Sequence, residues 1–250
     1  MRASQSNPVI GVVLPAGGLG RRMGGDRPKQ LLEIGGVPVW LHTMRAFAFR
    51  SDCAAISLVV PADWLDYFQK EVDLFRRDVR CNPQIIVVAG GAERWLSVRN
   101  GITALPSEVD RVMVHDVARP FVSHQILDRC VEEISAGRGV IVACPASDTV
   151  KRVSSEGRIL ETIDRREIWL AQTPQCFLRC DLEKWMELAE KESDFTPTDE
   201  ASLAEHYGSA VSVIRGDSLN DKMTLPEDRD RFEALWNSGY FNRFSSEVKK

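Results

Sequence analysis

Short apolar runs alternate along the chain with longer stretches whose apolar residues recur at helical spacing. The runs predict buried strands at residues 9–14, 56–60, 85–89, 111–115 and 140–144. The stretches between them predict helices at residues 38–49, 63–77, 95–105 and 124–136. Strands and helices that alternate at short spacing are typical of right-handed βαβ units. The pattern therefore predicts an α/β fold with a doubly wound, mostly parallel sheet and helices on both faces.

The alternation of strands and helices stops in the second half of the chain. From Asp148 to Gln172 the pattern contains no good helix and instead predicts a hairpin with strands at residues 149–153 and 158–163. A two-stranded ribbon has too little core to be stable alone. We therefore expect a protruding arm at about residues 146–173 that packs on a second subunit, with folding back onto its own domain as the alternative.

The rest of the chain returns to helices and adds one more strand. We expect helices at residues 181–191, after a capping Thr198, and from Pro226 onward, and a strand at residues 211–215. The sequence contains no linker or repeat, so residues 1–250 should form a single Rossmann-like domain that carries the arm.

Composition and charge narrow the class of protein. The chain has 250 residues, 44% of them hydrophobic, which is enough for a sizeable core. A net charge of −4 argues against a generally basic surface, so we expect neither nucleic acid nor membrane as a partner. The six cysteines form no Cys-x-x-Cys pair and suit small buried residues in a reducing cytoplasm. The N-terminus has no apolar segment of signal-peptide length, and no apolar run approaches the ~20 residues of a membrane span.

The stretch from Leu14 to Gln30, LPAGGLGRRMGGDRPKQ, follows the first strand directly. Its glycines let backbone N–H groups approach phosphate oxygens closely, and Arg22 and Lys29 add positive charge. The lysine does not stand where a Walker-type loop needs it, and Met23 occupies the third glycine position of a dinucleotide fingerprint. We therefore expect a phosphate site of another kind, with a glycine loop whose arginines are merely solvated as the alternative.

Loops after the other predicted strands should reach the same edge of the sheet, because ligands of open α/β sheets bind beyond the carboxyl ends of the strands. These loops are residues 90–94, 116–120 and 216–222. With the first loop they supply the cations Arg22, Lys29, Arg94, Arg119 and Lys222 and the carboxylates Asp116 and Asp217. This set suits a nucleoside triphosphate with Mg²⁺ and a second anionic substrate, because phosphoryl-type transfer depends on positioning and charge neutralisation.

The sequence offers no nucleophile that competes with this interpretation. Its histidines are His42, His115, His124 and His206, and no serine lies in a Gly-x-Ser-x-Gly motif. His115 ends a strand, where a satisfied core residue is commoner than a catalytic base. A covalent mechanism is therefore not expected.

Seven motifs follow one another along nearly the whole chain: PAGGLGRRM with PKQ, GGAERWLSV, HDVARPFV, SDTVKR, TIDRREIWLAQTPQCF, TDEASL and GDSLNDKMTLPED. Together they resemble the 2-C-methyl-D-erythritol 4-phosphate cytidylyltransferase family, which has the nucleotide-diphospho-sugar transferase fold. The TIDR, QTPQ and TDEAS segments favour this family over the related ribitol-5-phosphate cytidylyltransferases.

The resemblance implies an activity. The family transfers CMP from CTP to 2-C-methyl-D-erythritol 4-phosphate, giving 4-diphosphocytidyl-2-C-methyl-D-erythritol and pyrophosphate in non-mevalonate isoprenoid precursor biosynthesis. Mg²⁺ would be held mainly by the CTP phosphates, so we expect no protein ligand for the metal. The arm would reach across a homodimer.

The resemblance also implies roles for individual residues. The positions that match the nucleotide pocket are Ala16, Gly17, Gly18, Gly20, Arg22, Lys29, Gly91, Ala92, Ser97, Asp116, Val117 and Lys222. The positions that match catalytic residues are Arg22, Lys29, Arg165 and Lys222. The positions that match contacts with the methylerythritol phosphate are Asp116, Arg119, Thr149 and Arg165, of which Thr149 lies on the arm.

Two positions depart from the family pattern. Gly17 and Val117 both stand where alanine is usual, and by resemblance both face the nucleotide. Neither change removes a charge.

Two other functions stay open at this point: a cytidylyltransferase that acts on ribitol 5-phosphate or another sugar phosphate, and a non-catalytic nucleotide-binding regulatory domain.

Overall fold

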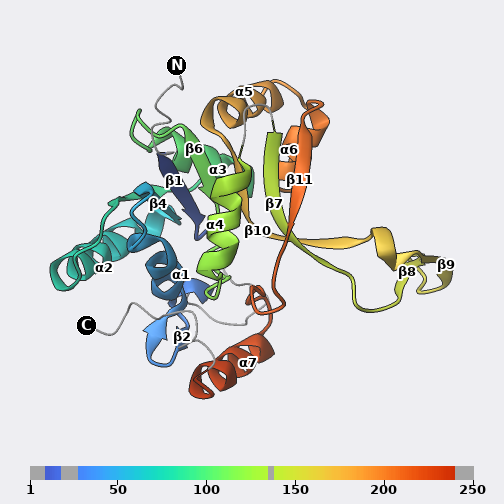
Figure 1. The fold of residues 1–250 in the computed structure, drawn as a ribbon, viewed down its shortest axis with the longest axis horizontal. Coiled ribbons are helices and arrows are strands. Elements are labelled where there is room, and N and C mark those ends of the chain that lie inside the picture. Colours follow the sequence, from blue (N-terminus) through green and yellow to red (C-terminus); the bar gives the residue numbers. More distant parts are fainter. Residues whose placement is uncertain (1–8, 18–27, 135–137, 240–250) are drawn as a thin grey trace.

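The computed structural model describes residues 9–17, 28–134 and 138–239. Within these ranges the centre of the molecule is a seven-stranded sheet with the order β11-β7-β10-β6-β1-β4-β5 (Figure 1). Its strands are β1 (Ile10–Pro15), β4 (Cys53–Val60), β5 (Gln84–Ala89), β6 (Arg111–Val114), β7 (Arg138–Pro145), β10 (Trp169–Leu178) and β11 (Ala210–Arg215). Neighbouring strands are parallel except for β10, which runs antiparallel to β6 and β7. The predicted mostly parallel sheet is confirmed.

Strand β10 joins the two parts of the sheet, and the hydrophobic pattern does not predict it. Its middle carries Gln172, Thr173 and Gln175, which are polar and nevertheless buried. Pro174 cannot donate a hydrogen bond to a neighbouring strand, and the register against β7 shifts between Ala171 and Gln175. A strand that buries polar side chains around a proline has neither the alternation nor the apolar run that marks a strand in a sequence.

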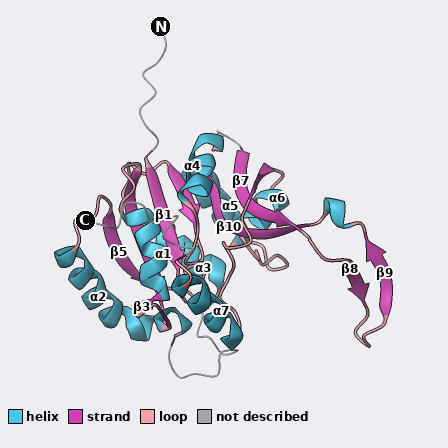
Figure 2. Cartoon of the chain, turned by 60° about the horizontal axis from the view of Figure 1, so that its bottom comes forward, coloured by secondary structure: helices cyan, strands magenta, loops and turns pink. Residues whose placement is uncertain are grey.

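Helices cover both faces of the sheet, as predicted (Figure 2). One core cluster packs α1 (Val39–Ala48), α2 (Leu65–Asp78) and α4 (His124–Glu133) against the sheet. A second cluster packs α3 (Arg94–Thr103), α5 (Arg179–Ala189) and α6 (Glu200–His206). Adjacent residues of β1 belong to different clusters, Val12 to the first and Val13 to the second, because successive side chains of a strand point to opposite faces.

The helix ends agree with the predictions except in two places. Ser123 caps α4, since its side chain accepts a hydrogen bond from the backbone N–H of Ile126. That helix ends at Glu133, before the predicted end at 136, which lies outside the described residues. The residue that caps α6 is Asp199 rather than Thr198, because the Asp199 carboxylate is the acceptor within reach of the Ser202 N–H, at 2.8 Å.

A small hairpin and the last helix form a third cluster. Strands β2 (Glu33–Ile34) and β3 (Val37–Pro38) meet at a turn of two glycines, Gly35 and Gly36, which both have positive φ. Helix α7 (Pro226–Asn237) begins at the predicted proline and packs against this hairpin, and the Glu233 side chain accepts a hydrogen bond from the Gly35 N–H at 2.9 Å. The remaining described helical turns are the 3₁₀ segments η2 (Lys29–Leu31), η3 (Ala62–Trp64) and η4 (Arg165–Glu167).

The predicted arm is present and points away from the sheet (Figures 1 and 2). It consists of the antiparallel strands β8 (Val150–Val153) and β9 (Ile159–Ile163), followed by η4. Large apolar side chains on the arm and at the start of β10 are exposed: Ile159 is 65% exposed, Leu160 59% and Leu170 58%. The arm does not fold back onto its own domain, so no other described part of the chain covers these apolar side chains.

The close contact between β7 and β10 gives a test of the fold. A Cβ added at Gly139 would lie 1.8 Å from the Phe177 ring, which is itself buried. We expect Gly139→Ala to lower the free energy of unfolding by about 1–3 kcal/mol through overpacking. Urea denaturation measures the change, and Ser212→Ala, at an exposed position of β11, is the control that should unfold like the wild type.

Candidate active site

The loops after β1 and β5 meet beside the end of β4, as predicted. The Ala16 N–H donates to the Val59 carbonyl at 2.7 Å, and the Gly90 N–H donates to the Val60 carbonyl at 2.8 Å. Ser97, near the start of α3, accepts a hydrogen bond from the Gly91 N–H at 3.0 Å. Two strand-end loops are therefore fastened to a third strand at one edge of the sheet.

Local packing requires glycine at position 91 but not at position 17. A Cβ at Gly91 would lie 2.6 Å from the Cβ of Leu96, whereas a Cβ at Gly17 would lie 4.0 Å from the Ser97 Oγ, which is ordinary contact. Gly17, Gly91 and Ala92 are exposed at this edge. The Gly91 N–H is already engaged by Ser97, and the assignment of these three residues to a nucleotide pocket stays a prediction. Gly18, Gly20 and Arg22 lie outside the described residues.

Lys29 and Gln30, at the end of the glycine-rich stretch, each bind a backbone carbonyl elsewhere in the chain. The Gln30 side-chain amide donates to the Ala16 carbonyl at 2.5 Å. The Lys29 ammonium donates to the Met223 carbonyl at 3.0 Å. Lys29 therefore lies beside the segment that carries Lys222, which joins two of the predicted cations.

Asp116 is the centre of the site. Lys222 Nζ lies 2.7 Å from Asp116 Oδ2, and Arg94 Nη2 lies 3.4 Å from Asp116 Oδ1. Arg119 Nε is 3.9 Å from Oδ2. The structure thus brings Asp116, Arg94, Arg119 and Lys222 together from the ends of β5, β6 and β11, as the order of loops predicts.

The charges around Asp116 keep its carboxylate ionised. Burial by itself would raise the pKa of Asp116, but the guanidinium of Arg94 and the ammonium of Lys222 outweigh burial and hold that pKa well below its usual range. Burial would lower the pKa of Arg94, but Glu200 and Asp116 raise it. Every charge in this partly buried group therefore has a partner of opposite sign.

His115 is a satisfied core residue, as predicted. Its imidazole is fully buried, with Nε2 3.0 Å from the Arg119 carbonyl and Nδ1 3.0 Å from the Thr173 hydroxyl. The same hydroxyl accepts a hydrogen bond from the Asp116 N–H at 3.0 Å. Burial lowers the pKa of His115 to about 4, so the ring is neutral. Its contacts hold the Arg119 carbonyl directly and the Asp116 N–H through the Thr173 hydroxyl.

Arg119 is held mainly by backbone carbonyls. Its guanidinium donates to the Asn220 carbonyl at 2.8 Å and to the Ala171 carbonyl at 3.5 Å, and the residue is only 8% exposed. Asn220 in turn donates to the Thr173 carbonyl at 2.7 Å. Arg119 therefore braces β10 against the loop after β11, and its contact with a substrate stays a prediction.

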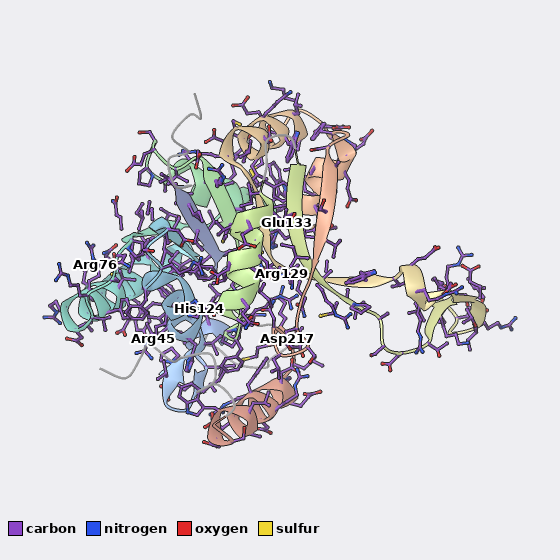
Figure 3. All side chains as sticks on the ribbon, in the orientation of Figure 1. Arg45, Arg76, His124, Arg129, Glu133 and Asp217 are labelled. Atoms are coloured by element: carbon purple, nitrogen blue, oxygen red, sulfur yellow. The ribbon has the colours of Figure 1, made fainter. Side chains whose placement is uncertain are left out.

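Four other predicted positions lie apart from the Asp116 group or point away from it. Val117 is 1% exposed and packs in the core, so any contact with a nucleotide would come from its backbone. Asp217 lies in the loop between β11 and α7 (Figure 3). Its carboxylate accepts a hydrogen bond from the Leu219 N–H at 2.9 Å and shapes its own turn. Arg165 and Thr149 are exposed on the arm, where Arg165 donates to the Ser147 carbonyl.

Four polar residues that support the site are absent from the candidates that the sequence predicts. Glu200, Gln172, Thr173 and Asn220 are buried and hydrogen-bonded around it. The available signal was composition: TDEASL and QTPQ place polar side chains inside stretches that turn out to be core. Local periodicity cannot separate such residues from loop residues.

The described residues offer no preformed metal cage. No group of three or more His, Cys, Asp or Glu side chains that could hold a metal occurs in the part of the chain that the structure describes. Asp116, the buried carboxylate of the site, is already paired with cations. This donor set fits a Mg²⁺ ion that arrives on nucleotide phosphates.

Within the described residues, no helix has both the length and the apolar character needed to span a bilayer.

Fold and site together define a nucleotidyltransferase, since strand-end glycine loops and lysines meet at one edge of a mostly parallel sheet. Residues 10–238 match the family model described as IspD, 2-C-methyl-D-erythritol 4-phosphate cytidylyltransferase. The chain therefore belongs to this family of cytidylyltransferases.

Individual relatives agree with the family assignment. The cytidylyltransferase of that name from Syntrophus aciditrophicus is 39% identical over 228 residues, which cover 91% of this chain and 96% of the relative. The cytidylyltransferase from Bacillus velezensis is 38% identical over 225 residues, which cover 90% of this chain and 94% of the relative. Among solved structures, the 4-diphosphocytidyl-2C-methyl-D-erythritol synthase of Anaerococcus prevotii is 27% identical with a TM-score of 0.78, covering 92% of this chain and 97% of that one.

The buried histidine gives a pH prediction. The unfolded chain protonates His115 below about pH 6.5, whereas the folded protein resists protonation until about pH 4, so stability falls as the pH is lowered through this window. The loss from His115 amounts to roughly 3 kcal/mol at its largest. Burial also lowers the pKa of His42, which acts in the same direction.

Urea titrations at several pH values test this expectation. The wild type should lose stability between pH 7 and pH 5, and His115→Gln should lose less over the same interval, because it lacks the buried imidazole. An equal pH dependence in both proteins would contradict the assignment.

Proposed function

We propose that the chain transfers CMP from CTP to 2-C-methyl-D-erythritol 4-phosphate and releases pyrophosphate. The observation that carries this proposal is the meeting of Lys29, Lys222 and the ion-paired Asp116 beside glycine loops at one edge of the sheet. Two anionic reactants need such a place, because their mutual repulsion opposes reaction. Backbone amides and ammonium groups offset that repulsion.

The chemical step is an in-line displacement. A phosphate oxygen of the acceptor forms a bond to the α-phosphorus of CTP, and the bond from that phosphorus to the bridging oxygen breaks. The electron pair leaves with pyrophosphate. The attacking oxygen is already anionic, so no general base is needed, which agrees with the neutral, fully engaged His115.

The lysines act by position and charge. Lys222 holds the α-phosphate and the incoming phosphate together, and Asp116 orients its ammonium group at 2.7 Å. Lys29 and Arg22 stabilise the charge that develops on the α-phosphate. Mg²⁺, bound through the CTP phosphates, would neutralise part of the triphosphate charge and assist departure of pyrophosphate.

We propose a homodimer in which each arm completes the partner's site. The exposed apolar side chains of the arm, Ile159 and Leu160 among them, support this assembly, since a covered arm would lose apolar surface to water. Arg165 and Thr149 would then reach the acceptor phosphate from the second subunit. Each subunit contributes one domain with its arm.

We place the protein in the cytoplasm. Cys53, Cys130 and Cys176 are buried free thiols that pack as small apolar residues. Such use of cysteine suits a reducing compartment.

Pyrophosphate release with CTP tests the activity and the acceptor together. The purified protein should release pyrophosphate with 2-C-methyl-D-erythritol 4-phosphate far faster than with ribitol 5-phosphate.

Lys29→Ala should lower kcat by about two orders of magnitude without changing the melting temperature, since the substitution removes charge from the transition state and little packing from the core. Lys70→Ala, on the exposed face of α2, is the matched control and should keep wild-type turnover. Equal rates in the wild type and Lys29→Ala would refute the proposed role.

Mixing two inactive variants tests the shared site. In mixed dimers of Arg165→Ala and Lys222→Ala, one of the two sites carries both wild-type side chains, so random pairing should restore about one quarter of the wild-type activity. If Arg165 served its own subunit, every site would be defective and the mixture would stay inactive.

A further inference from the structure

Glu200 is a buried carboxylate that the proposed reaction does not use. It is the first residue of α6, and its side chain is 2% exposed. Both carboxylate oxygens accept hydrogen bonds from Arg94, Oε1 from Nη1 at 2.7 Å and Oε2 from Nη2 at 3.1 Å. This two-pronged pair has close to ideal geometry for a guanidinium and a carboxylate.

The start of α6 is fixed to the sheet, so Glu200 has little freedom. The Gln175 side chain donates from Nε2 to Asp199 Oδ2 at 2.8 Å and accepts at Oε1 from the Ala201 N–H at 2.9 Å. Gln175 belongs to β10 and is 2% exposed. The residues on either side of Glu200 are thereby held by one buried amide.

Arg94 lies between two carboxylates and is bound unequally to them. Its bonds to Glu200 are short, whereas Nε and Nη2 both reach Asp116 Oδ1 at 3.4 Å, near the limit of a hydrogen bond. On the other side of Asp116, Oδ2 is engaged by Lys222 at 2.7 Å. Oδ1 therefore keeps acceptor capacity that it would lose if Arg94 paired with Asp116 as closely as it pairs with Glu200.

We propose that Glu200 is a positioning residue that acts through Arg94 and keeps Asp116 Oδ1 available to accept a hydrogen bond from a hydroxyl group of a bound reactant. The inference rests on the proposed function, because both reactants of that reaction carry hydroxyls. The hydroxyl belongs either to the ribose of the nucleotide or to the sugar-alcohol acceptor, and the two sources separate by experiment.

Kinetics of Glu200→Gln test the proposal. The amide has the same shape but holds Arg94 less firmly, so Arg94 should turn toward Asp116 and occupy Oδ1. We expect the KM of one reactant to rise about 10- to 100-fold, as for loss of a hydrogen bond to a charged group, with kcat changed much less. A raised KM for CTP assigns the hydroxyl to the ribose, and a raised KM for the acceptor assigns it to the sugar alcohol. Glu205→Gln, exposed on the same helix, is the control and should match the wild type.

Two further variants keep the test decisive. Glu200→Asp retains the charge and should recover part of the KM change. In an Arg94→Gln background, Glu200→Gln should have almost no further effect, because the residue through which it acts is gone. If the KM changes of Arg94→Gln and Glu200→Gln multiply in the double variant, the proposal is overturned. It is also overturned if Glu200→Gln raises both KM values equally and lowers the melting temperature.

The proposed function and this inference can fail separately. If the wild type releases no pyrophosphate, the function fails, and calorimetric binding constants for CTP and for the acceptor replace the KM values in the same comparison. If the wild type turns over and Glu200→Gln keeps both KM values, only the positioning role fails.

Discussion

The site depends on one buried carboxylate held ionised among cations. Asp116 is 8% exposed, yet Lys222, Arg94 and Arg119 surround it. Burial alone would favour the neutral acid, and the attraction of the neighbouring charges reverses that preference. An ion group of this kind adds little net stability, because desolvation offsets most of the attraction, but it fixes the direction in which each cation points.

The antiparallel strand β10 makes this arrangement possible. It supplies Thr173, which holds both the backbone of Asp116 and the ring of His115, and Gln175, which holds the start of α6. A parallel strand in the same place would need its own crossover connection. An antiparallel strand instead brings the arm directly to the edge of the sheet where the loops gather. Strand β10 thus positions the residues of the site and connects the arm to the sheet.

Two regions of this protein place side chains in unfavourable surroundings. Around Asp116 charged side chains are ion-paired and largely buried, whereas the apolar side chains of Ile159 and Leu160 on the arm and of Leu170 at the start of β10 are exposed. Both patterns are costly in an isolated chain: the first through desolvation and the second through apolar hydration. In the proposed homodimer, covering the arm would remove the cost of exposing its apolar side chains.

The sequence by itself determined the alternating elements, the arm and the loops that carry the chemistry, because strand and helix periodicity, glycine turns and strand-end charges are local properties. It did not determine β10, since buried polar side chains around Pro174 leave no periodic signal. Only the tertiary structure decided the pairing of Asp116 with Lys222 and of Arg94 with Glu200, each 106 residues apart in the chain. Such pairs form because the sheet order brings distant strand ends together, and no local pattern encodes that order.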